Sequence, residues 1–242
     1  MKVAAQIRKA IERIPESKPF GYADLGIEAT DFYSAAKALE RLQKKGALKK
    51  IAKGVFYKPE ISVLGALPPD YDSLLQNYLY EGDKRTGYIT GYALYNQLSL
   101  TTQMAFTTTI ASNRSRKKIN IGWIKTNNAK AYVQVTEDNY PLLGILDAIK
   151  DIKSIPDSSV SKILKILIPK IKKYTKKDIE NSIKFALKYP PRVRALLGAI
   201  IENTFKNEFD LMALKQSLNP STIYKLGIMQ IDLPTVKNWN II

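Results

Sequence analysis

The N-terminal fold is decided by residues 30–58, which read TDFYSAAKALERLQKKGALKKIAKGVFYK. Thr30 is expected to cap the N-terminus of a helix, and Asp31 in the first turn complements the helix dipole. The helix should run to Lys45, because Gly46 supplies the left-handed residue that commonly ends a helix. This part of the stretch therefore predicts a single helix between two recognisable end signals.

A β-hairpin is predicted directly after this helix. Two short β-prone runs, Ala47–Ala52 and Val55–Lys58, are separated by Lys53-Gly54, a dipeptide typical of hairpin turns. The hairpin carries three basic residues near its tip, Lys49, Lys50 and Lys53.

The predicted helix has two distinct faces at 100° per residue. The face expected to be buried consists of Phe32, Ala35, Ala36, Leu39 and Leu42. The opposite face consists almost entirely of hydrogen-bond donors: Tyr33, Ser34, Lys37, Arg41 and Lys44.

A second amphipathic helix is predicted upstream, over residues 2–14, and Pro15 ends it. Its apolar positions recur every three or four residues: Val3, Ile7, Ala10, Ile11 and Ile14. A loop containing Ser17, Pro19 and Gly21 leads to a short helical turn at Tyr22–Leu25, and Gly26 breaks the chain. Three helices followed by a basic hairpin predict a winged helix-turn-helix domain over residues 1–60.

This order of elements favours DNA binding. The second helix of such a motif fits the major groove and presents side chains to base edges, while basic hairpin residues neutralise phosphates. The alternative for the charged helix face, taken alone, is plain solvation. The residues predicted to contact DNA are Thr30, Tyr33, Ser34, Lys37, Arg41, Lys44, Lys49, Lys50 and Lys53.

The overall charge agrees with a polyanionic partner. The 242 residues hold 38 Lys+Arg against 22 Asp+Glu, a net charge of +16, with 45% hydrophobic residues. The excess lies in two zones, residues 1–60 at +6 and residues 150–194 at +9. The chain has no histidine and no cysteine, which excludes disulfides, imidazole or thiolate metal sites and His-based catalysis.

A larger second domain is predicted over residues 61–242, because Lys58-Pro59 favours a linker. It should hold a helix at Tyr88–Leu98 and a small sheet at about 100–136. The predicted strands are Gln103–Ala111, Lys118–Lys125 and Ala131–Thr136. Helices are expected at about 141–220, namely 141–153, 158–173 (with Pro169 kinking it), 176–189, 191–205 and 208–218. The fold class is α+β, predominantly helical, ending in a helical bundle.

The second basic zone lies on these helices. In the 158–173 helix, Val160, Ile163, Leu164, Leu167 and Ile171 form the apolar side. Three interpretations of the opposite side remain open: a solvated face, a face for an acidic partner, or a phosphate track. The lysines concerned are Lys162, Lys165, Lys172, Lys173, Lys176 and Lys177.

Three segments resemble AbiEi-type antitoxins. Residues 34–58 are similar to the winged helix of that family, although Phe56-Tyr57 stands where two tyrosines are common. Residues 90–103, TGYALYNQLSLTTQ, resemble the segment that opens the family's second domain, and residues 113–121, NRSRKKINI, resemble the basic strand entry that follows. The resemblance covers about the first two thirds of the chain and leaves residues 155–242 without a motif.

The resemblance implies a bacterial antitoxin of a type IV, abortive-infection-like system. In that family the winged helix binds operator DNA to repress the antitoxin–toxin operon, and the second domain counteracts a nucleotidyltransferase toxin. A homodimer on the DNA is a further expectation.

Two other functional classes remain open, a plain winged-helix regulator whose C-terminal domain dimerises or senses a ligand, and a nucleic-acid-processing enzyme. No catalytic motif is recognisable, so we expect no enzymatic activity, cofactor or metal. No export or membrane segment is recognisable either, and a cytoplasmic location is the expectation.

Overall fold

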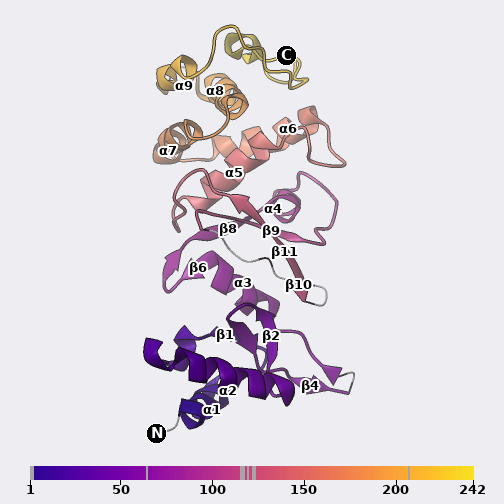
Figure 1. Cartoon of the computed structure of the whole chain (residues 1–242). Helices are drawn as coiled ribbons and strands as arrows, with labels where there is room; N and C mark the ends of the chain where they lie inside the picture. Colours follow the sequence, from indigo (N-terminus) through magenta and orange to yellow (C-terminus); the bar gives the residue numbers. More distant parts are fainter. Residues whose placement is uncertain (1–2, 64, 115–117, 119, 122–123, 207) are drawn as a thin grey trace. The chain divides into compact units, whose positions relative to one another are not determined.

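The structure is a computed structural model that describes residues 3–63, 65–114, 118, 120–121, 124–206 and 208–242. It combines helices with small antiparallel sheets in a predominantly helical α+β fold, as the sequence predicts. The chain divides into two compact units (Figure 1). The first contains Met1–Asp83 and Ser115–Asn128, and the second contains Lys84–Arg114 and Ala129–Ile242.

The first unit extends beyond the predicted boundary at Lys58-Pro59. The Ser17 N–H donates to the Lys58 carbonyl at 2.8 Å, and the Asp70 N–H donates to the Ser17 carbonyl at 2.8 Å. The Tyr57 hydroxyl donates to the carbonyl of Leu67 at 3.1 Å. These bonds attach residues 58–70 to the N-terminal elements. The proline marks a local break in strand pairing, and the chain stays in the same unit until Asp83.

The N-terminal part of the first unit is built from two helices and a three-stranded sheet. The helices α1 (Val3–Arg13) and α2 (Phe32–Lys44) pack against each other, and two 3-10 turns, η1 (Ala23–Leu25) and η2 (Ala29–Asp31), lie between them in sequence (Figure 1). The strands β1 (Pro19–Gly21), β2 (Lys49–Ala52) and β3 (Val55–Tyr57) pair antiparallel in the order β1-β3-β2. Their shared core is Ile7, Ile11, Phe20, Leu25, Ala35, Leu39, Leu48 and Phe56.

Three sequence predictions in this region are wrong. The segment predicted as a loop around Pro19 is strand β1, because the buried Phe20 pairs with Phe56 of β3. Thr30 is not the N-cap of α2, since it lies inside η2 and the cap position belongs to Asp31, whose side chain makes no capping hydrogen bond. Phe32 is not buried, because it is the first residue of α2 and lies outside the core. Its side chain is 52% exposed and packs on the Tyr22 ring.

The end of α2 follows the prediction. The Gly46 N–H donates to the Gln43 carbonyl and the Ala47 N–H donates to the Leu42 carbonyl, which are the two bonds of a Schellman motif. Gly46 has φ of +74°, the left-handed conformation that this motif requires.

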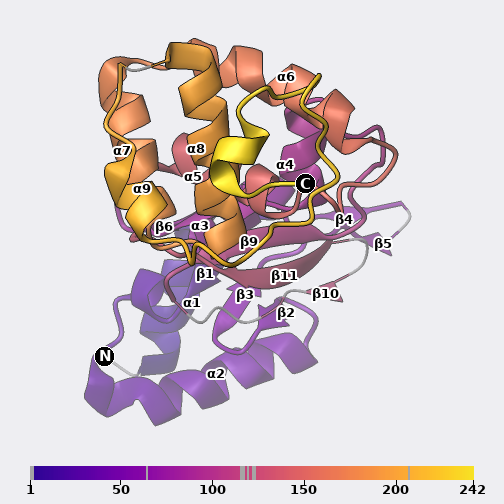
Figure 2. The same cartoon turned by 90° about the horizontal axis from the view of Figure 1, so that it is seen from above.

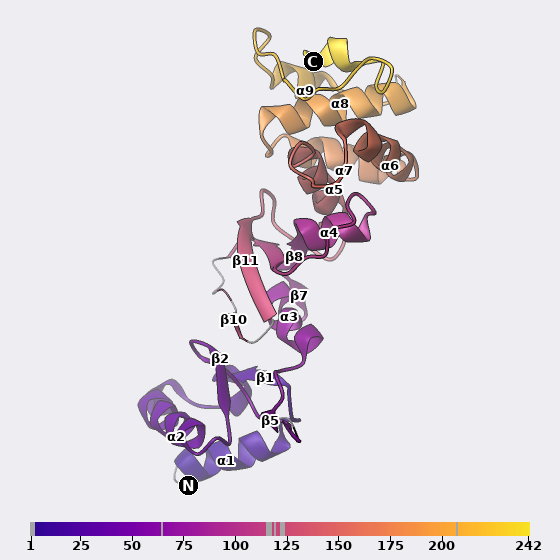
Figure 3. The same cartoon turned by 90° about the vertical axis from the view of Figure 1, so that its right-hand side faces the viewer.

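The first unit continues through four short elements to Asp83. These are β4 (Ile61–Ser62), β5 (Gly65–Ala66), α3 (Tyr71–Leu79) and β6 (Tyr80–Glu81). The Asp70 side chain caps α3 by accepting from the Ser73 N–H at 2.8 Å. In the second segment of the unit, β10 (Asn120–Ile121) pairs with the beginning of β11 (Ile124–Lys130), as Figure 3 shows.

The second unit opens with strands and continues as helices. After β7 (Lys84–Arg85), the strands β8 (Gly87–Thr90) and β9 (Thr108–Ser112) pair antiparallel, with α4 (Tyr92–Gln97) between them in sequence. The helices that follow are α5 (Tyr140–Lys150), α6 (Val160–Lys172), α7 (Lys176–Ala186), α8 (Pro191–Phe205) and α9 (Met212–Gln216), and a 3-10 turn, η3 (Val236–Trp239), ends the series.

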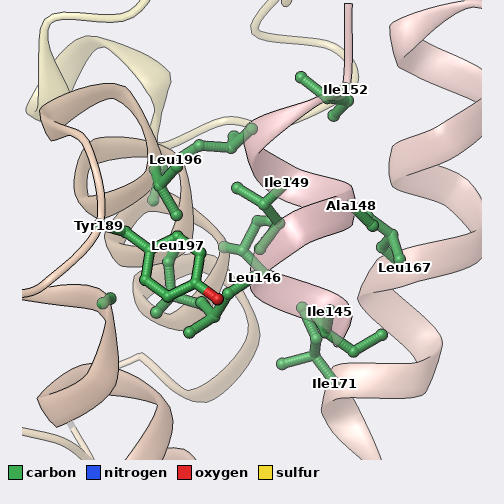
Figure 4. Close-up of a cluster of buried hydrophobic side chains, with 14 of the residues drawn as sticks. Ile145, Leu146, Ala148, Ile149, Ile152, Leu167, Ile171, Tyr189, Leu196 and Leu197 are labelled. Atoms are coloured by element: carbon green, nitrogen blue, oxygen red, sulfur yellow. The ribbon is translucent and has the colours of Figure 1, made fainter. Parts of the chain in front are cut away.

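The central helix of this unit is α8. It packs against α5, α6, α7, α9 and η3 (Figure 2). Its buried residues meet those of α5 and α6 in one continuous core (Figure 4). Members of that core include Ile145, Leu146, Ile149, Leu167, Ile171, Leu196 and Leu197.

The strands that were predicted for the second domain differ most from the structure. Residues 88–90, predicted as helix, belong to β8. Strand β9 begins at Thr108 instead of Gln103, and residues 131–136 form no strand. The predicted strand 118–125 falls on β10 and the start of β11, and residues 119, 122 and 123 within it lie outside the described residues.

A buried polar cluster explains why residues 88–90 form a strand. The Asp147 carboxylate on α5, only 1% exposed, accepts hydrogen bonds from the hydroxyls of Tyr88 (2.8 Å) and Thr90 (2.7 Å) on β8. Lys150 completes the cluster, with its Nζ 3.2 Å from Asp147 Oδ1. Alternate residues of a strand share a face, so β8 can present both hydroxyls to one carboxylate. The cluster therefore fixes β8 on α5.

Candidate nucleic-acid interface

The outer face of α2 is exposed, as predicted. Ala35 and Leu39 are completely buried on the inner face, and the 3.6-residue period of the helix directs the donor residues away from them. Tyr33 is 71% exposed even though it is a large aromatic residue. The other exposed members are Ser34, Lys37, Arg41 and Lys44.

Two of these side chains contact each other. The Lys37 ammonium lies 4.6 Å from the centroid of the Tyr33 ring, within the range of a cation–π interaction. At an exposed site such a contact contributes about 0.5–1 kcal/mol. It holds the lysine and the aromatic ring together near the N-terminal end of α2, the end that contacts base edges in helix-turn-helix proteins.

One acidic residue lies within the basic face and was missed by the sequence analysis. Glu40 accepts a hydrogen bond from Lys44, with 2.9 Å between Oε1 and Nζ, and both side chains are exposed. This hydrogen bond and the charge of Lys44 lower the pKa of the Glu40 carboxyl group, and Lys37 and Arg41 lower it further. Lys44 is thus partly neutralised within its own helix, so it offers less charge to a ligand than Lys37 does.

A hollow of about 390 Å³ lies between α1 and α2. Its apolar lining is Ala4, Ala38 and Leu42, and its charged lining is Arg8, Arg41, Lys44 and Lys45. Arg41 therefore borders both the outer face of α2 and this hollow. Arg8 and Lys45 were not predicted as site residues, because their proximity depends on how α1 packs on α2, which no local pattern in the sequence encodes.

The hairpin of β2 and β3 carries its three lysines at the surface. Lys49 and Lys50 lie on β2, and Lys53 precedes Gly54, whose φ of +82° makes the tight turn. Successive side chains of a strand point to opposite faces. Lys49 and Lys50 are therefore not expected to reach the same ligand, although both are exposed.

The six lysines of the second basic zone are also exposed. They lie on α6 and around the start of α7 in the second unit, and α6 buries Ile163, Leu164, Leu167 and Ile171 on its other side, as predicted. The lysines are Lys162, Lys165, Lys172, Lys173, Lys176 and Lys177. Pro169 lies inside α6, between the two groups of lysines.

Two negative findings apply to the described part of the chain. In it, no three Asp or Glu residues come together in a group that could hold a metal ion. None of the helices described there is long and apolar enough to cross a membrane.

Comparisons with known proteins give a family and distant similarities of fold. Residues 4–183 match a family described as Family of unknown function (DUF6088). The chain belongs to this family. A search of curated proteins finds no match. A crystal structure of the RV2827C protein from Mycobacterium tuberculosis is similar with a TM-score of 0.49 and 9% identity, over 93% of this chain and 85% of that one.

The DUF6088 match includes all candidate site residues of the sequence analysis. It contains the α1–α2 hollow, the hairpin lysines and the six lysines of α6 and α7. Helix α8 and everything after it lie beyond the DUF6088 region.

Proposed function

We propose that this DUF6088 protein binds double-stranded operator DNA through a winged helix-turn-helix in its first unit. In this proposal α2 is the recognition helix, β2 and β3 form the wing, and the protein is an antitoxin that represses its own operon. Both units act in the cytoplasm, and no catalytic role is assigned to either.

The observation that carries the DNA-binding part is the outer face of α2. It exposes a tyrosine, a serine and two basic side chains, Lys37 and Arg41, that form no ion pair among the described residues, on a helix whose inner face is fixed by a core. A helix of this size fits the major groove, and lysine or arginine on it can pair with guanine. The exposed lysines of the β2–β3 hairpin supply phosphate contacts, which orient a protein on DNA without reading its sequence.

The antitoxin part rests on the resemblance of residues 34–58, 90–103 and 113–121 to AbiEi-type antitoxins. It predicts a neighbouring gene that encodes a nucleotidyltransferase toxin. The lysine face of α6 and α7 offers a surface for an acidic partner, and we assign toxin neutralisation to the second unit on this basis. A homodimer on a palindromic operator fits the same proposal.

Fluorescence anisotropy tests the DNA-binding part. The full chain should bind a duplex from the region upstream of its own gene at least about a thousandfold more tightly than a scrambled duplex at the same salt concentration. Lys37→Ala should weaken this binding, whereas Lys165→Ala, which removes an equal charge from α6, should leave it unchanged. Equal affinity for both duplexes would overturn the proposal of operator recognition.

Co-expression with the neighbouring gene tests the antitoxin part. If that gene encodes a toxin, the full chain should restore growth. A chain that binds its operator specifically but never protects cells would instead be a plain transcriptional regulator.

A further inference from the structure

A hollow of about 620 Å³ lies at the N-terminal end of α8, outside the residues that match the family. The two prolines that precede and begin α8 form part of its wall. The polar side chains that line it are Arg192, Arg194, Ser217, Asn219, Thr222 and Tyr224. Among the described residues of this lining there is no aspartate and no glutamate.

Arg194 is a fixed cation without an acidic partner. Its Nε donates to the Tyr189 carbonyl at 2.9 Å and its Nη1 donates to the Ser217 carbonyl at 2.8 Å. These bonds position the half-buried guanidinium, and none of the ion pairs in the described part of the chain involves it. A guanidinium has five N–H donors in a planar fork, so the Nη2 edge remains available to a ligand. Partial burial of a cation that has no acidic partner is unfavourable unless an anion binds beside it.

Tyr224 supplies a second unsatisfied group in the same lining. The residue is 8% exposed, and its hydroxyl is buried without a hydrogen-bond partner among the described residues. Its backbone is held on both sides, because its N–H donates to the Asn240 carbonyl at 2.7 Å and its carbonyl accepts from the Ile242 N–H at 3.0 Å. A buried hydroxyl that lacks a partner destabilises the fold. A ligand oxygen in the hollow would remove that cost.

The remaining lining also favours a ligand that accepts hydrogen bonds. The side-chain oxygen of Asn219 already accepts a hydrogen bond from the Ser221 N–H at 2.9 Å. The side-chain NH₂ of Asn219 is therefore the group that can donate to a ligand. Thr222 adds an exposed hydroxyl, and Arg192 adds an exposed guanidinium on the first turn of α8. The positive end of the 15-residue α8 faces the same region and attracts anions.

We propose that this hollow binds a phosphate group, either as inorganic phosphate or as part of a nucleotide. Arginine forks and hydroxyl donors match the several acceptor oxygens of a phosphate, and charge-assisted bonds of this kind are the strong ones. The site joins the start of α8 to the segment after α9, so a bound phosphate stabilises the second unit. The inference is independent of the proposed DNA binding, which involves the first unit.

Isothermal titration calorimetry on the full chain tests the site with four probes at constant ionic strength. Inorganic phosphate and adenosine monophosphate distinguish the free ion from a nucleotide, adenosine tests the base alone, and acetate tests a carboxylate. We expect saturable binding of phosphate or the monophosphate, and a melting temperature that rises with the concentration of that ligand. Absence of saturable binding by both, or equal binding of acetate, overturns the proposal.

Two variants and one control locate the binding. Arg192→Gln and Tyr224→Phe should each weaken binding about tenfold, the effect of losing one charge-assisted hydrogen bond. Tyr224→Phe should leave the melting temperature without ligand unchanged or higher, because it deletes a hydroxyl that has no partner. If Tyr224 had a purely structural role, Tyr224→Phe would instead lower the melting temperature without changing the affinity.

Lys165→Gln makes an equal change of charge on α6 and should bind the ligand as the wild type does. An equal loss of affinity in this control would overturn the site.

Discussion

The indole ring of Trp239 lies directly against the backbone of Gly198, so that a Cβ atom on residue 198 would overlap the six-membered ring of the tryptophan. Gly198 is in the middle of α8, and Trp239 is in η3, 1% exposed. The indole Nε1 donates a hydrogen bond to Glu202, one turn further along α8. The absence of a side chain at Gly198 is therefore what allows the C-terminal turn to pack on the central helix.

Gly198→Ala should destabilise the protein by about 3 kcal/mol, because the indole cannot move without breaking its bond to Glu202 and overpacking a core typically costs 1–3 kcal/mol. Urea unfolding followed by tryptophan fluorescence measures the change. The matched control is Gly144→Ala in α5, where the added Cβ would lie 3.1 Å from a methyl group of the half-buried Leu94. That side chain can shift, so the control should change stability by less than about 1 kcal/mol. Equal effects of the two variants would contradict this account of Gly198.

Stability should fall steeply in alkali because of tyrosines in the second unit. Burial, reinforced by the Asp147 carboxylate, raises the pKa of Tyr88 and of Tyr189 far above the usual value, and burial with Asp151 does the same for Tyr95. Folded chains keep these protons at a pH where unfolded chains lose them. The stabilisation is therefore complete below pH 10 and is lost as the pH rises above it.

The expected slope is about 1.4 kcal/mol per pH unit for each such tyrosine. Urea unfolding at several pH values between 8 and 11 measures it. Tyr88→Phe should lower stability at pH 8, since the Asp147 carboxylate loses a donor, and should also make the alkaline decline shallower. An unchanged slope in this variant would show that Tyr88 titrates alike in both states.

The sequence was sufficient for α2 and for α5 to α8 of the second unit, because each has a clear helical period and recognisable ends. Gly46 ended α2 as predicted, and Pro191 begins α8. The sequence was insufficient for the short strands, because the residues that hold them are distant along the chain. Tyr88 and Thr90 directly precede the apolar pattern of a helix, and the partner that holds both of them in β8 is Asp147, 59 and 57 residues away.

The candidate interface was predictable to a similar degree. Helical period alone placed Lys37 and Arg41 on the exposed face of α2. It could not identify Arg8, which joins the charged hollow only because α1 packs on α2. Glu40 could have been found from the sequence, since it stands four residues before Lys44, the spacing at which helical side chains pair.

Substitutions of opposite charge on α2 should have opposite effects on DNA affinity. Lys37→Ala or Arg41→Ala should weaken operator binding by about 1–3 kcal/mol if the contact is to a base. Glu40→Gln should strengthen it, because the variant removes a negative charge from the face and releases Lys44. Fluorescence anisotropy at one salt concentration measures the affinity of all three variants. Partial unfolding would weaken binding, so it cannot explain a gain of affinity in the Glu40 variant together with a loss in the other two. Wild-type affinity in both the Lys37 and the Arg41 variants would exclude α2 as the recognition helix.

The hairpin lysines should act through charge alone. Each phosphate contact that is lost lowers the slope of log affinity against log salt concentration by about one. Since Lys49 and Lys50 point to opposite sides of β2, the triple variant Lys49→Ala, Lys50→Ala, Lys53→Ala should lower the slope by about two rather than three. Its preference for the operator over a scrambled duplex should persist. A slope equal to that of the wild type would show that the hairpin lies off the DNA.

The lysine face of α6 and α7 decides whether the second unit has a role in protection. Lys165→Glu, Lys172→Glu and Lys173→Glu leave the buried side of α6 intact, so the triple variant should fold and bind operator DNA as the wild type does. If an acidic partner binds this face, the variant should lose protection against the neighbouring toxin in a growth assay, because reversed charges repel the partner.

Point variants suit this test better than a chain shortened at Pro59, since residues 61–83 and 115–128 belong to the first unit. The control is Lys37→Ala, which should weaken operator binding but still protect cells when expressed from an unrelated promoter. Full protection by the charge-reversed variant, together with loss of protection in Lys37→Ala, would assign neutralisation to the first unit and leave the lysine face as a solvated surface.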